Sequence, residues 1–278
     1  METMDIIKSA FIFPSQNLEK LAIYIALSFV VGILFLGGVL TGVLGIANNA
    51  VFIVFAVILF ILAIVVGLLL GGYQVNLIKS GIDQTEEAPN FGWKSDVVTG
   101  LKWLIVSIVY FIIPAIVVVI VGFITNVPGQ VMKIIQEFAA ASASVNETAN
   151  TTASMPVTIS NAAISSLVSS LALTGLVALI LFIIFTFLKT MGDARLANTG
   201  SLGEALNIVE AFKDISRIGF GKVIAVILLS FIIVTVINGI LGIFYARVPF
   251  LSILSIIVSP YLMFFTQRVT GLLYSDIA

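Results

Sequence analysis

The chain has 278 residues, of which 60% are hydrophobic and only 10% are charged, and its formal net charge is −1. Soluble domains carry about 25% charged residues, so this composition excludes a protein whose surface faces water on all sides. Cysteine and histidine are absent, which excludes disulfides, zinc–thiolate and iron–sulfur sites, palmitoylation and imidazole acid–base chemistry. We therefore expect no metal, no cofactor and no catalytic residues.

The first 20 residues mix both signs of charge around a proline and lack the basic flank and cleavage site of a signal peptide. We expect the first helix to remain in the mature protein. Five charge-free stretches follow, over residues 21–78, 103–132, 148–188, 223–246 and 248–267. A membrane-spanning helix needs about 20 apolar residues, so the first stretch holds two spans, with a turn at residues 47–50, and each of the others holds one.

Helices rather than strands fill these stretches, because residues 52–72 are apolar on every side and show none of the alternation of a membrane barrel. The sequence therefore predicts an all-α, polytopic membrane protein with six transmembrane helices and a single membrane domain over residues 1–278. The charge-free stretches place no ionisable group in the membrane interior, which disfavours ion-coupled carriers and voltage sensors.

Positive residues set the orientation of such a chain. Eleven of the thirteen lysines and arginines fall on the side that holds both termini, and only Lys133 and Arg247 fall on the other side. We expect a multi-pass protein of the cell membrane with cytoplasmic N- and C-termini.

An external loop is then expected over residues 126–165. Its first part, residues 129–138, spaces Val131, Ile134, Ile135 and Phe138 along one face of a short helix lying in the membrane interface. Its second part is a mobile, low-complexity linker of small residues. Asn146 and Asn150 begin glycan acceptor triplets there, a pattern that also arises by chance in such sequences.

A shift of 119 residues aligns residues 77–108 with 196–227, and pairs Gly81 with Gly200 and Gly100 with Gly219. A weaker copy opens the chain. We infer three tandem parallel units, over 5–80, 81–199 and 200–272, each an amphipathic cytoplasmic helix (the elbow helix) followed by a transmembrane hairpin. The alternative is chance similarity, since any polytopic protein has amphipathic loops with basic flanks.

The third elbow helix starts at a capping box formed by Ser201 and Glu204, and its residues Glu204, Lys213 and Asp214 are expected to face water. We expect the lysines that begin spans running outward from the cytoplasm to reach the lipid headgroups. We also expect the cluster of basic residues on the third elbow helix to contact anionic lipid, although the positive-inside topology alone also explains these positions. The predicted interfacial contacts are Lys20, Lys102, Lys213, Arg217 and Lys222.

Residues 71–106 resemble the family known as domain of unknown function 4013. The resemblance lies in an acidic stretch, a proline, an aromatic–tryptophan pair, and a Gly-Leu-Lys sequence where the chain re-enters the membrane. Residues 194–222 resemble the family too. The resemblance covers most of the chain except residues 139–160, which look like an insertion. It implies an integral membrane protein of a kind found largely in archaea, and it carries over no catalytic or binding residue.

Few residues inside the spans suggest chemistry. Asn238 is a candidate for lining a path, with an interhelical hydrogen bond as the favoured role. Pro114 and Pro260 are expected to kink their helices, either at a transport site or for packing alone. Gly38-x-x-x-Gly42 and Gly67-x-x-x-Gly71 predict close helix contacts, within the chain in the favoured interpretation and at a dimer interface in the alternative. Glu86, Glu87 and Asp193 are candidates for binding a headgroup or metal, although a solvated loop is the favoured interpretation.

We therefore expect a non-enzymatic protein that organises membrane or interacts with lipid or partner proteins. The alternative is a transporter or channel for a small neutral or amphipathic solute. An intramembrane enzyme is least favoured, because no catalytic set is visible. The expected partners are the lipid bilayer, with anionic headgroups or other membrane proteins as further possibilities, and no nucleic acid; the sequence leaves the oligomeric state open.

Overall fold

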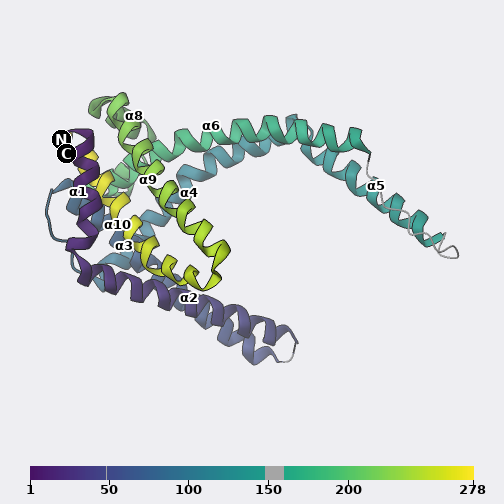
Figure 1. Cartoon of the computed structure of the whole chain (residues 1–278), viewed down its shortest axis with the longest axis horizontal. Coiled ribbons are helices and arrows are strands. Elements are labelled where there is room, and N and C mark those ends of the chain that lie inside the picture. Colours follow the sequence, from purple (N-terminus) through teal and green to yellow (C-terminus); the bar gives the residue numbers. More distant parts are fainter. Residues whose placement is uncertain (48, 148–159) are drawn as a thin grey trace. The chain divides into compact units, whose positions relative to one another are not determined.

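The computed structural model describes residues 1–47, 49–147 and 160–278, and every element in these ranges is a helix (Figure 1). Six of the helices described there are long and apolar enough to cross a membrane, which confirms the predicted all-α membrane protein. The elements are α1 (Thr3–Gln16), α2 (Leu18–Ala47), α3 (Ala50–Ile82), α4 (Trp93–Ile124), α5 (Val127–Glu147), α6 (Asn161–Thr199), α7 (Leu202–Ala205), α8 (Ile208–Ile218), α9 (Phe220–Arg247), η1 (Pro249–Leu254) and α10 (Ser255–Tyr274).

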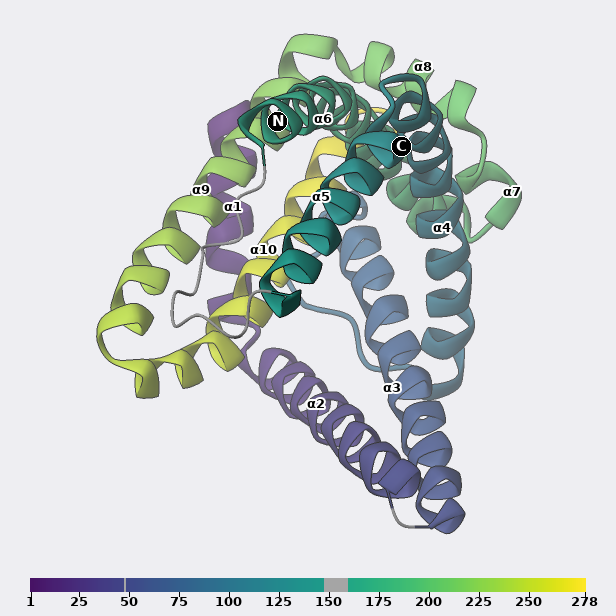
Figure 2. The same ribbon diagram turned by 90° about the vertical axis from the view of Figure 1, so that its right-hand side faces the viewer.

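The chain forms two compact bodies. The larger body comprises residues 1–108 and 187–278, and the smaller body comprises residues 109–186. In the larger body α2 and α3 pack along each other as a hairpin, and α10 packs against α1, α3 and α9 (Figures 1 and 2). The two ends of the chain lie together there (Figure 1), because Lys222 binds both the Asp276 carboxylate and the Met1 carbonyl.

Local capping signals place the helix ends. The predicted turn at residues 47–50 is confirmed, and the Asn49 side chain accepts a hydrogen bond from the Val51 N–H at the start of α3. Gly200, with φ +65°, follows the end of α6, and Gly219, with φ +106°, joins α8 to α9. Glycine adopts these left-handed conformations without the steric penalty of other residues.

The elbow helices differ from the prediction at two places. Residues 83–92, all of them described, form no helix, because Pro89 and Gly92 interrupt the segment and α4 begins only at Trp93. The third elbow is two helices, since Asn207 caps the start of α8 and separates it from α7. Ser201 accepts a hydrogen bond from the Glu204 N–H as the capping box requires, but the Glu204 carboxylate turns to Arg195 instead.

Small residues bring the helices of the larger body close together. Gly38 and Gly42 face Phe60 and Ala56 across the α2–α3 hairpin, which confirms the predicted internal contact. Gly71 contacts the Trp103 ring of α4, whereas a Cβ on Gly67 would meet nothing within 4 Å. The helices approach even more closely at two other crossings, where a Cβ would collide with backbone atoms. These are the crossing of α3 with α4 at Gly72 and Gly100, and that of α3 with α10 at Gly81 and Gly271.

The smaller body contains the predicted helix over residues 129–138 as part of α5. The helix continues to Glu147, past the point where the linker was expected, because the alanines that follow residue 138 favour helix. The backbone N–H and hydroxyl of Ser160 both donate to Glu137 and lower the pKa of that carboxyl. Asn146 falls within α5, and Asn150 lies outside the described residues.

Candidate functional site

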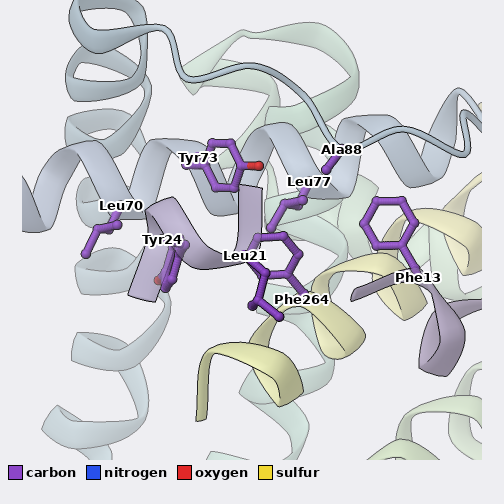
Figure 3. Close-up of a cluster of buried hydrophobic side chains, with 8 residues drawn as sticks. All are labelled: Phe13, Leu21, Tyr24, Leu70, Tyr73, Leu77, Ala88 and Phe264. Atoms are coloured by element: carbon purple, nitrogen blue, oxygen red, sulfur yellow. The ribbon is translucent and has the colours of Figure 1, made fainter. Parts of the chain in front are cut away.

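A cluster of buried apolar and aromatic side chains joins α1, α2, α3 and α10 (Figure 3). Tyr24 of α2 packs edge-on against Phe264 of α10, with 5.7 Å between ring centroids. Tyr73 of α3 lies between Tyr24 and the loop residue Phe91, on which it stacks at 3.9 Å. The remaining members of the cluster are Phe13, Leu21, Leu70, Leu77 and Ala88.

A groove of about 630 Å³ lies between α2 and the first half of α10. This volume is within the range of sites that bind small molecules. Tyr24 belongs to both the buried cluster and the groove, so the cluster fixes one wall. The α2 side is formed by Tyr24, Ser28, Phe29, Gly32, Ile33 and Leu36, and the α10 side by Ser255, Ile256, Ser259, Pro260 and Met263. All of these lining side chains are uncharged.

Behind the groove, a chain of side-chain hydrogen bonds crosses three helices. Gln267 Nε2 of α10 donates to Gln74 Oε1 of α3 over 3.2 Å, and Gln74 Nε2 donates to the Tyr24 hydroxyl oxygen of α2 over 3.0 Å. Interhelical hydrogen bonds of this kind hold spanning helices in register. The Tyr24 side chain is therefore fixed both by its ring contacts and by its hydroxyl.

Of the predicted kink and polar positions, one lies in the groove. Pro260 forms part of the wall and has no N–H, so the Ile256 carbonyl one turn earlier lacks its helical partner. Pro114 is buried within α4 of the smaller body. Asn238 departs from expectation, because its amide donates to the Val234 carbonyl of its own helix and its side chain is exposed.

A second polar centre of the larger body lies around Arg195 of α6. Its guanidinium donates to Asp214 of α8 over 2.8 Å, and it also binds both the carbonyl and the carboxylate of Glu204. The Tyr274 hydroxyl and Arg217 donate to the same Asp214 carboxylate, over 3.1 and 3.0 Å. Asp214 is 1% exposed, so the prediction that it faces water is wrong. Its burial follows from the pairing with Arg195, which the helical pattern of α8 alone does not reveal.

Two further charged groups of the larger body are buried. Asp193 pairs with Lys189 one turn earlier in α6 and is almost fully buried, so the expectation that it lies in a solvated loop is wrong. Arg268 of α10 donates to the Ser80 carbonyl and lies over the Phe13 ring at 4.4 Å. The spanning helices extend past the charge-free stretches, and they therefore contain these buried ionisable residues.

The five basic residues predicted to contact lipid all have partners in the chain. Lys20 pairs with Glu19, and Lys102 donates to the Gly200 carbonyl at the end of α6 over 2.8 Å. Lys222 binds the C-terminal segment, as described above. On α8, Lys213 donates to Glu210 and lowers its pKa, and Arg217 binds Asp214. Two of these contacts lie at helix C-termini, where cations are favourable: Lys102 binds the carbonyl that follows α6, and Arg217 lies in the last turn of α8.

The glycines that the repeat alignment pairs have different surroundings. Gly81 packs against Gly271 inside a helix crossing, whereas its counterpart Gly200 is a left-handed residue in open space. Gly100 lies against the Leu68 carbonyl, whereas Gly219 is again left-handed and open. The threefold repeat therefore stays a prediction. Among the residues that the structure describes, no cluster of carboxylates has the arrangement of a metal site.

Comparison with protein families matches residues 55–246 to the family described as Protein of unknown function (DUF4013), in agreement with the resemblance predicted from the sequence. The matched range includes α4 to α8 entirely and most of α3 and α9. Searches of curated proteins and of solved structures gave no match.

Proposed function

The chain belongs to the family described as Protein of unknown function (DUF4013), and we propose its role from the groove between α2 and α10. In this proposal the protein is a non-enzymatic integral membrane protein that holds the apolar part of an amphipathic lipid in this groove. The observation that carries the proposal is the groove itself: it has a volume of about 630 Å³, its lining is uncharged, and the buried Tyr24 forms part of its α2 wall. Apolar walls with few polar groups are typical of sites for such ligands.

The buried carboxylates of the larger body support a non-enzymatic role. Asp193 and Asp214 each lie in an ion pair, and Asp96 accepts hydrogen bonds from the Gly92 N–H and the Asn76 amide. Carboxylates fixed in this way stabilise the packing of helices. A general acid or base, in contrast, has to exchange a proton with a substrate within hydrogen-bond reach.

The protein lies in the cell membrane with both termini in the cytoplasm, and α1 and α8 rest on the inner leaflet. The distribution of lysine and arginine supports this orientation. Exposed apolar side chains support the position of the two helices: Phe11 and Ile12 on α1, and Val209 and Phe212 on α8. Lys213 lies beside Phe212 and is positioned to meet anionic headgroups there. The three-unit repeat remains our interpretation of why such helices recur.

Transport of the same kind of molecule is the second candidate function. It is favoured by Pro260, which leaves the Ile256 carbonyl without a helical partner in the wall of the groove. Interrupted helices often line the paths of transporters.

Filling the groove tests the proposal. A Cβ on Gly32 or on Gly67 meets nothing within 4 Å, so Gly32→Leu and Gly67→Leu are matched changes inside and outside the groove. With a photoactivatable phospholipid in nanodiscs, we expect the wild type to be labelled on residues 24–36 and 255–263. The leucine of Gly32→Leu occupies space in the groove and removes the burial of about two lipid methylene groups. This lowers the affinity for lipid, and with it the labelling, about tenfold. Gly67→Leu leaves the labelling unchanged.

Two results would oppose this role. Equal labelling of the groove and of the exposed face of α9 would show that the groove has no preference for lipid, and equal labelling of all three proteins would show the same. A second measurement separates holding from transport. If the protein transports, liposomes with the wild type pass a fluorescent lipid between leaflets faster than protein-free liposomes, and Gly32→Leu slows this passage.

A further inference from the structure

We propose that the groove selects neutral lipids whose polar end carries a hydrogen-bond acceptor, such as a hydroxyl or an ester oxygen, and that the Tyr24 hydroxyl recognises this atom. The inference rests on the proposed lipid-holding function and names the class of lipid. It starts from the lining, which contains only uncharged side chains. A phosphate or carboxylate placed there would lose its hydration without gaining a counter-ion.

The hydrogen bonds behind the groove leave the Tyr24 proton available. Because Gln74 donates to the Tyr24 oxygen and itself accepts from Gln267, the Tyr24 oxygen serves as an acceptor. No described residue accepts the Tyr24 O–H, although the side chain is only 6% exposed. A buried donor without a partner is unfavourable, and this one belongs to a residue that lines the groove. A ligand oxygen at this end of the groove supplies the missing acceptor.

The other polar groups of the lining are consistent with a neutral hydroxyl-bearing ligand. Of its three serines, Ser28 and Ser255 donate to backbone carbonyls one turn earlier, whereas Ser259 is exposed and offers a second, uncharged hydroxyl on the α10 wall. The Ile256 carbonyl, to which Pro260 has no N–H to donate, adds a backbone acceptor to the same wall for a ligand hydroxyl. Arg268 follows Gln267 in the chain but binds Ser80 and Phe13, outside the groove lining.

The test compares four molecules with the same 16-carbon chain. The probe is hexadecanol with a diazirine in its chain, and the competitors are hexadecanol, hexadecane and hexadecyl phosphate. In wild-type protein we expect hexadecanol to compete about tenfold better than hexadecane, which is the effect of one buried hydrogen bond. Hexadecyl phosphate competes no better than hexadecane.

Tyr24→Phe removes only the hydroxyl and keeps the ring contacts, so it lowers the hexadecanol-to-hexadecane ratio from about ten to about one. Tyr73→Phe is the matched control, because Tyr73 is buried in the same cluster but donates to the Pro89 carbonyl and does not line the groove. It leaves the ratio unchanged. Gln74→Met removes the amide that holds the Tyr24 oxygen and lowers the ratio without removing the hydroxyl, which identifies Gln74 as a positioning residue.

Three outcomes would overturn the inference: a ratio that Tyr24→Phe does not change, a Gln74→Met ratio equal to that of the wild type, or a preference for hexadecyl phosphate. The ratio also separates this inference from the proposed function. If Gly32→Leu fails to reduce hexadecane binding, the groove is not a lipid site at all. If Gly32→Leu reduces it while Tyr24→Phe preserves the ratio, the groove binds lipid but does not select it through Tyr24.

Discussion

Asp214 is a buried carboxylate on which three side-chain donors of the larger body converge. Arg195, Arg217 and Tyr274 all donate to its carboxylate, so that one side chain ties α8 to α6 and α10. Removing one partner of a buried ion pair leaves the other charge uncompensated, which is more costly than the pair itself is stabilising.

Asp214→Ala is therefore expected to lower the free energy of unfolding by about 3–5 kcal/mol. Thermal or denaturant unfolding of the detergent-solubilised protein measures the loss. The control is Glu210→Ala on the same helix, which breaks the more exposed pairs with Lys213 and Arg217 and has a much smaller effect because solvent screens such pairs. Equal destabilisation by the two variants would contradict the central position of Asp214.

Residue by residue, the sequence predicts contacts only where the signal is local. The Ser201 cap and the Gly38 and Gly42 contacts follow from short spacings, and the structure has them. The burial of Asp214 depends on Arg195, nineteen residues away in the chain, and on Tyr274, sixty residues away. The groove depends on how α10 packs against α2, which the pattern of either helix alone does not specify.

At the scale of elements, glycines set how closely α3 approaches its neighbours. A Cβ on Gly72 would lie 1.8 Å from the Asp96 carbonyl oxygen, and one on Gly100 would lie 1.7 Å from the Leu68 carbonyl oxygen. Backbone atoms at these positions have little room to move, so either methyl group would force α3 and α4 apart.

Gly72→Ala is accordingly expected to separate α3 from α4 and to destabilise the fold by about 1–3 kcal/mol, the usual cost of overpacking. Gly67→Ala, on the same helix but facing open space, is expected to be neutral or stabilising by up to about 1 kcal/mol, because alanine favours helix more than glycine does. Unfolding midpoints of the two purified variants make the comparison. Similar midpoints would mean that the crossing tolerates a side chain.

The spans themselves follow from the sequence with little ambiguity, since charged residues and turns mark their ends. The segments between them do not. Residues 83–92, at the start of the second predicted unit, form no helix, and α5 extends into residues that composition alone assigns to a linker. The proline and glycine of the first segment interrupt a helix, and the alanines of the second favour one.

For the whole molecule, the decisive prediction is the direction of threading. The chain has no cysteine, so a single cysteine can be introduced at Gly203, in α7, or at Gln136, in α5. An impermeant thiol reagent added to intact cells is expected to label Gln136→Cys and to miss Gly203→Cys, because the distribution of lysine and arginine predicts that α7 faces the cytoplasm. Permeabilised cells should show labelling at both positions. The reverse pattern in intact cells would invert the proposed orientation.

The crossing of Gly81 with Gly271 also constrains how the protein is made. The ribosome adds about 5–20 residues per second, so on the order of ten seconds or more separates the synthesis of Gly81 from that of Gly271. Throughout this interval the first hairpin sits in the bilayer with its glycine surface and the Ser80 carbonyl uncovered, because their partners on α10 do not yet exist. Lipid or the insertion machinery has to occupy that surface until α10 arrives, and α10 then completes the packing that the α2–α3 hairpin begins.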